Sequence, residues 1–177
     1  NIFPQRKLSV IELPVPADNP ALPEKLAEEF RGDLSINSGK PIPSFTKDPR
    51  ISWLVELLKN LQPQKVLLIC HTKQKAIAIQ KAIRSKANLN LALFHEDLTL
   101  IQRDRMAAHF ADPEGAQLLI CSEIGSENRN FQFAQHLVFF DYPLNLELIE
   151  QRIGRLDRIG QAGKINIYAP VVKNSPQ

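Results

Sequence analysis

The sequence contains only two cysteines, Cys70 and Cys121, and each of them ends an apolar run. No Cys-x-x-Cys or His-x-x-x-His spacing occurs, which removes the usual sequence signatures of a zinc site, so we expect no bound metal. We expect both cysteines to be buried, reduced thiols in a cytosolic setting rather than partners in a disulfide. The sequence also lacks a signal peptide and an apolar run of about 18 residues, so neither a secretory leader nor a membrane span is predicted.

A phosphate-binding loop of the form Gly-x-x-x-x-Gly-Lys-Ser/Thr is missing as well. Gly39-Lys40 is followed by Pro41, and Gly163-Lys164 is followed by isoleucine. A chain that bound ATP alone would need such a loop to hold the β and γ phosphates. If this chain takes part in nucleotide chemistry, we therefore expect it to contribute only part of the site.

The bulk composition is that of a globular protein. Apolar residues make up 44% of the 177 residues, which is enough for a core, and the length suits one domain. The formal net charge is +3, from 22 basic and 19 acidic side chains. That balance permits nucleic acid as a partner without arguing for it. The chain begins at Asn1 rather than methionine, and we expect a fragment or a processed piece.

Segments typical of strands and helices alternate along most of the chain. Continuous apolar runs such as residues 65–70 are typical of strands buried on both faces of a parallel sheet. The pattern predicts an α/β fold with a mostly parallel sheet and right-handed crossovers. The expected strands are 8–13, 65–70, 89–94, 116–121, 136–140 and 164–168, and the expected helices are 23–30, 49–62, 74–86, 99–110 and 147–161.

Local signals support several of these boundaries. Asp48 and Pro49 are a good N-cap and a good first helical residue. Thr99 with Gln102 three residues later has the form of a capping box. We expect residues 1–47 to be a linker or extension and residues 48–177 to form the domain.

Polar residues directly follow the expected strands, and in open parallel sheets ligands bind beyond the carboxyl ends of strands. They include His71 and Thr72, His95 to Asp97, Ser122 to Gly125, Asn130 and Asp141. An ordinary place at a strand end explains His71 and His95 as well as a functional role does. A lone His-Glu-Asp run is a weak indication of acid–base chemistry, and the sequence lacks the Gly-x-Ser-x-Gly elbow that a nucleophilic Ser122 would need.

The segment from residue 147 to 161 predicts a helix that ends at a glycine. At about 100° per residue, Gln151, Arg155 and Arg158 fall in a narrow line opposite an apolar stripe, whereas Arg152 falls outside that line. A solvated helix face would explain the line without any function. Arginine is, however, the residue suited to bidentate phosphate contacts, and the glycines between these residues favour close approach of a ligand.

The pattern Gln151-x-x-x-Arg155-x-x-Arg158-x-Gly160-Gln161 resembles the last signature motif of the Swi2/Snf2 helicase-like ATPases of superfamily 2. The run from Ser122 to Phe131 resembles an earlier motif of that family, although Ser126 and Asn128 depart from its usual glycine-rich turn. The resemblance covers residues 49–169 and implies a RecA-like helicase C-terminal lobe. Within the family, the residues of these two motifs are similar to those of a bacterial branch that acts on RNA polymerase.

The resemblance implies a role for each of the matching residues. Arg155 and Arg158 would contact the γ-phosphate of ATP as arginine fingers, with Gln151, Gly125 and Asn130 beside the nucleotide. The nucleic-acid contacts that it implies are Thr72, His95 and Ser122, which would touch the DNA or DNA/RNA backbone.

The resemblance also implies partners and a location. Mg²⁺ and most ATP contacts would belong to a first lobe absent from this chain, so we expect these 177 residues alone to be inactive. The full-length protein would be a cytoplasmic, nucleoid-associated, DNA-dependent ATPase that promotes recycling of RNA polymerase. The alternative is a non-catalytic RecA-like module that binds nucleic acid or RNA polymerase. A phosphate-binding loop encoded upstream would favour the enzyme, and a start codon directly before Asn1 would favour the module.

Overall fold

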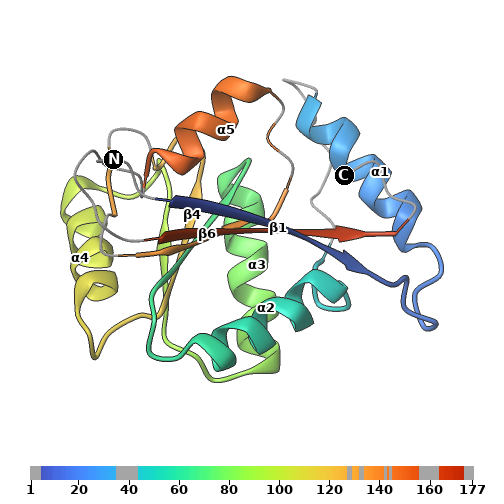
Figure 1. Cartoon of the computed structure of the whole chain (residues 1–177), viewed down its shortest axis with the longest axis horizontal. Coiled ribbons are helices and arrows are strands. Elements are labelled where there is room, and N and C mark those ends of the chain that lie inside the picture. The colour runs from blue at the N-terminus through green and yellow to red at the C-terminus, as the bar shows by residue number, and fades with distance from the viewer. Residues whose placement is uncertain are drawn as a thin grey trace.

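The computed structural model describes residues 5–34, 44–126, 129–131, 134–141, 143, 145–155 and 164–173. They form a six-stranded sheet in the order β1-β6-β5-β2-β4-β3, in which every neighbouring pair is parallel (Figure 1). The strands are β1 Gln5–Leu13, β2 Val66–Cys70, β3 Leu91–Phe94, β4 Leu118–Ser122, β5 His136–Phe139 and β6 Lys164–Val172. The predicted α/β class with a parallel sheet is confirmed.

Helices pack on both faces of this sheet. Their bounds are α1 Leu22–Leu34, α2 Pro49–Leu61, α3 Lys73–Lys86, α4 Leu100–Ala111 and α5 Leu146–Ile153. One apolar cluster joins α2 and α3 to one face, and a second joins α4 and α5 to the other. In Figure 1, α2 accordingly lies below the sheet and α5 lies above it.

The central strands are buried on both faces, as their continuous apolar sequences predict. Every residue of β2 and β4 is buried, including Cys70 and Cys121 at or near their ends. Both cysteines are free thiols, so the expectation of buried, reduced cysteines is confirmed. In the part of the chain that the structure describes, no helix has the length and apolar character needed to cross a membrane.

Side-chain caps fix where the helices begin. The Asp48 carboxylate accepts from the backbone N–H of Arg50 at the start of α2. At the start of α4, Thr99 and Gln102 form both hydrogen bonds of the predicted capping box. These caps satisfy backbone donors that a helix leaves open in its first turn.

Residues before Asp48 contribute to the same sheet. β1 pairs with β6 along its whole length, from Gln5 opposite Lys164 to Leu13 opposite Val172. Leu13 and Val172 pack with two leucines of α1, so α1 lies at the carboxyl ends of β1 and β6. The boundary at residue 48 stays a prediction, but β1 and α1 pack on the sheet rather than apart from it.

Two predicted helices have different lengths in the structure. The helix expected over residues 23–30 is longer in the structure, because α1 continues through Gly32 to Leu34. The helix expected over residues 147–161 ends at Ile153, where the N–H of Gly154 closes the last turn onto Glu150. The chain then leaves the helix. The carbonyl of Arg155 accepts from the backbone N–H of Phe131, in the segment that follows β4.

Candidate functional site

The carboxyl ends of the parallel strands lie at one edge of the sheet, and this edge gathers most of the polar residues that the sequence singled out. Side chains from the segments after β2, β3, β4 and β5 meet there, together with the end of α5. Two groups can be distinguished. One surrounds Arg155, and the other surrounds Gly125.

Arg155 lies directly after α5, against the segment that follows β4. Its carbonyl accepts from the backbone N–H of Phe131 at 2.6 Å, and its Nη1 donates to the carbonyl of Arg129 at 3.4 Å. The Asn130 side chain donates to the carbonyl of Gly154 at 3.1 Å. Three backbone and side-chain contacts therefore hold the segment of Asn130 against the turn that carries Arg155.

The guanidinium of Arg155 is incompletely hydrogen-bonded. Among the residues that the structure describes, its buried Nε–H has no partner, and its one bond to a carbonyl is long. A buried guanidinium donor without a partner costs free energy, on the order of 1–3 kcal/mol. Phosphate oxygens match the fork of an arginine, and a phosphate would supply the missing acceptor once a local movement uncovers this nitrogen.

The expected line of Gln151, Arg155 and Arg158 along one helix is wrong, because α5 ends at Ile153. Gln151 is an exposed residue of α5, whereas Arg155 is placed by the turn that follows the helix. The turn bonds the N–H of Arg155 to the carbonyl of Arg152. Arg158 lies outside the described residues.

Gly125 sits in a tight turn against the end of β3. A Cβ atom at Gly125 would lie 2.6 Å from the Cα of His95 and 2.7 Å from the Oγ of Ser122, so no larger residue fits without movement. The Ser122 hydroxyl donates to Glu96 at 2.6 Å and accepts from the N–H of Gly125 at 3.0 Å. His95, Ser122 and Gly125, all nominated from the sequence, therefore form one packed cluster.

Burial differs among the three residues expected to touch nucleic acid. Ser122 is 1% exposed and His95 is 9% exposed, and both already bond within the protein. Thr72 is half-buried, and its hydroxyl caps α3 by accepting from the N–H of Lys75. Of the three, Thr72 is therefore the residue most open to a ligand.

Arg152, which the helical projection set aside, is 1% exposed and anchors α5 to the sheet. Its Nη1 and Nη2 donate to the carbonyl and carboxylate oxygens of Asp141, each at 2.8 Å. Its Nε donates to the Glu123 carboxylate at 2.6 Å. Arg152 thus ties α5 to the ends of both β5 and β4, three residues before Arg155.

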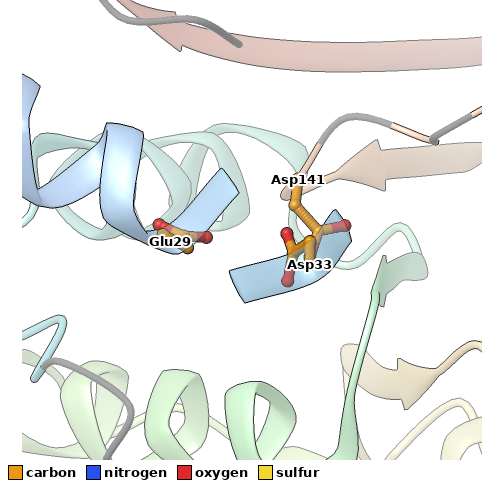
Figure 2. A group of neighbouring side chains, drawn as sticks. All are labelled: Glu29, Asp33 and Asp141. Carbon is orange, nitrogen blue, oxygen red and sulfur yellow. The ribbon is translucent and has the colours of Figure 1, made fainter. Parts of the chain in front are cut away.

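Asp141 has a second set of partners on the other side. Its Oδ2 accepts from the backbone N–H of His71 at 2.8 Å and from the Lys75 ammonium at 3.0 Å. That ammonium also contacts two carboxylates of α1, Glu29 at 2.8 Å and Asp33 at 2.5 Å. Figure 2 shows the carboxyl groups of Glu29, Asp33 and Asp141, whose nearest oxygens lie within 4.8 Å of one another. Lys75 already supplies the positive charge for this acidic group.

Electrostatics divides the carboxyl groups of this network. Burial alone would raise the pKa of Asp141, but Lys75 and Arg152 outweigh it and hold that pKa well below its usual range. Burial raises the pKa of Asp33 and of Glu123, and their cationic neighbours offset it only in part. Asp141 is therefore the fixed negative centre on which Lys75 and Arg152 converge.

Little in the sequence indicates this network. Asp141 was identified as a residue after a strand, but Glu29 belongs to an expected helix, residues 23–30, in the segment expected to be a linker or extension. Arg50, which is fully buried, occupies a position in α2 where an exposed arginine would be unremarkable. The one available signal was the position of Arg152 away from the Gln151 face, nearer the side of α5 that packs inward.

The fold is that of a helicase C-terminal lobe, and the chain belongs to the helicase conserved C-terminal domain family, whose match covers residues 49–160. Solved structures agree in fold. The C-terminal part of the Fun30 ATPase domain superposes with a TM-score of 0.62 at 21% identity, covering 85% of this chain and 50% of that one. Domain 2 of the DEAD-box helicase Mss116p, bound to an RNA duplex, gives 0.60 at 17% identity, covering 96% of this chain and 55% of that one.

Among curated proteins, the chain is similar to RNA polymerase-associated protein RapA. It is 45% identical to RapA of Pseudomonas syringae pv. syringae strain B728a and 46% identical to RapA of Pseudomonas fluorescens strain SBW25, in each case over 180 aligned residues. The alignments cover 99% of this chain but only 19% of each relative. The predicted resemblance to a helicase C-terminal lobe and to this bacterial branch is confirmed.

Proposed function

We propose that this chain is the second lobe of a Snf2-type, DNA-dependent ATPase that resembles RapA and acts on RNA polymerase complexes during transcription. The family of the chain and its similarity to proteins named as RNA polymerase-associated support the proposal. Because the chain covers 19% of those relatives, ATP hydrolysis and promotion of polymerase recycling are proposed for the full-length protein.

In this proposal, ATP with Mg²⁺ is bound mainly by a first lobe, and this lobe supplies arginines to it. The observation that carries the proposal is the buried Nε–H of Arg155, which lacks a partner in the described part of the chain. Its guanidinium would neutralise charge on the transferring phosphoryl group, with Arg158 as the second finger. Asn130 and Gly125 would shape the adjacent turn, and exposed Gln151 would face the first lobe.

The nucleic-acid contacts are proposed at the same edge of the sheet. The half-buried hydroxyl of Thr72, at the start of α3, is suited to a backbone phosphate. Such contacts would be independent of base sequence and weakened by salt. His95 and Ser122 would act by shaping the surface, because both are buried.

The test is the steady-state ATPase rate of the full-length protein with Arg155→Ala. We expect kcat to fall about 10³-fold or more with the fold intact, as for other arginine fingers. Arg105→Ala is the matched control, since Arg105 is an exposed arginine of α4. A kcat for Arg155→Ala equal to that of the control would refute the assigned role. Residues 1–177 alone should hydrolyse no ATP, and turnover by them would contradict the division of the site between two lobes.

A further inference from the structure

The two residues that directly follow β5, Phe140 and Asp141, are held from three helices. Arg50 of α2 donates from Nη1 to the carbonyl of Phe140 at 3.1 Å. Lys75 of α3 and Arg152 of α5 bind the carboxylate of Asp141. All three cations are buried, and each comes from a different helix. Removing a charged partner from one of them therefore affects the contacts of the others.

Helix α1 controls two of those three cations through one side chain. The Glu29 carboxylate contacts Arg50 Nη2 at 2.8 Å through Oε2 and Lys75 Nζ at 2.8 Å through Oε1. The Glu29 side chain is only 2% exposed, so water cannot replace it as a partner for either cation. Glu29 therefore bridges the cation that holds Phe140 and the cation that holds Asp141.

Arg152, the third cation, connects Asp141 to the turn that carries Arg155. Arg152 binds Asp141 by two hydrogen bonds, and its own carbonyl accepts from the N–H of Arg155 at 3.2 Å. α5 comprises only eight residues, so a shift at Arg152 displaces the turn that carries Arg155. A continuous path of buried contacts thus runs from α1 to Arg155.

We propose that Glu29 is a positioning residue for Arg155. Through Glu29, α1 fixes the position of α5 at the carboxyl edge of the sheet. α1 lies outside residues 49–160, which match the helicase family, so this dependence is a property of the extension rather than of the matched lobe. The coupling between Glu29 and Arg155 is structural and does not depend on ATP hydrolysis. Its effect on catalysis rests on the function proposed above.

The first measurement is hydrogen–deuterium exchange of the full-length protein carrying Glu29→Gln. Glutamine keeps the shape of the side chain and removes the negative charge that Glu29 presents to both cations, while Arg50 keeps its ion pair with Asp48 and Lys75 keeps its ion pair with Asp141. We expect amides of residues 146–155 to exchange about tenfold faster, while those of β2 and β4 keep their wild-type rates. The matched control is Glu28→Gln, because Glu28 is the neighbouring, exposed acid of α1. Equal exchange in the two variants overturns the coupling.

The second measurement is ATP hydrolysis by the same variants. We expect Glu29→Gln to lower kcat about tenfold with less than a twofold change in the KM for ATP, because misplacing a catalytic group affects the chemical step. A general loss of folding would lower the active fraction without the selective exchange near Arg155. If the wild-type protein hydrolyses no ATP, the proposed function fails while the exchange result still decides the coupling.

If Glu29→Gln does not fold, Asp33→Asn carries the same test. Asp33 contacts Lys75 alone of the three cations, so the contact between Glu29 and Arg50 survives. We expect faster exchange of residues 146–155 in the same direction and smaller in extent. Unchanged exchange in this variant overturns the proposal.

Discussion

Replacing Arg152 by alanine removes a buried side chain that joins α5 to the ends of two central strands. Three hydrogen bonds would be lost, two to Asp141 at 2.8 Å and one to Glu123 at 2.6 Å. All three involve charged groups, and Arg152 and Asp141 are almost completely buried. The consequence should therefore be a loss of stability rather than a local change at the surface.

The size of that loss follows from what remains. Removing one member of a buried ion pair typically costs about 3–5 kcal/mol, because its partner stays buried without compensation. Asp141 would keep Lys75 and the N–H of His71, and the Glu123 side chain is 14% exposed and can regain some water. We therefore expect about 3 kcal/mol, the lower end of the range. Domains of this kind are stable by about 5–15 kcal/mol, so the variant should still fold.

Urea unfolding measures this loss directly, with the single tryptophan, Trp53, as the fluorescent probe. The ring of Trp53 lies 6.1 Å from that of Tyr168 in β6, so its emission should report on loss of the sheet. Gln151→Ala is the control, since Gln151 is the adjacent exposed residue of α5 and should cost less than about 0.5 kcal/mol. A loss for Arg152→Ala below about 1 kcal/mol would refute the view that Arg152 anchors α5.

Two further predictions concern the packed turn and pH. Gly125→Ala should destabilise the chain by about 1–3 kcal/mol in thermal unfolding, since its Cβ would lie 2.6 Å from the Cα of His95, and an unchanged Tm would contradict that packing. Burial lowers the pKa of His136, whose ring nitrogens lie 3.0 Å from Tyr168 Oη and 2.7 Å from Gln64 Oε1. The unfolded chain then binds the proton more readily, so stability should fall as pH drops below about 6.5, and His136→Gln should reduce that dependence in urea titrations at different pH values.

The elements whose signals are local were predictable from the sequence. Asp48 with Pro49 and Thr99 with Gln102 begin helices because each cap is complete within a few residues. Residues 66–70 form a buried strand because an uninterrupted apolar run has no other favourable place in a sheet of this kind. The motif residues around Gly125 and Arg155 were recognisable for the same reason, since their spacing along the chain is itself the signal.

The end of α5 could not be predicted, because it depends on a distant segment. Helical periodicity continues past residue 153, but the carbonyl of Arg155 accepts from Phe131 instead of continuing the helix. That bond joins residues 24 positions apart in sequence, and no pattern within residues 147–161 encodes it. Gln151 and Arg155 therefore do not lie on one helix, because α5 ends between them.

The sequence by itself determined the α/β alternation, the buried strands, the caps and the family to which residues 49–160 belong. Only the tertiary structure decided that Glu29, in the segment expected to be a linker or extension, meets Lys75 and Arg50 in the interior. It also decided that Arg152 is buried while neighbouring Gln151 is exposed. The physical reason is that a charged residue is expected at the protein surface when only its sequence is known. Its partners in a buried ion pair come from elements that only folding brings together.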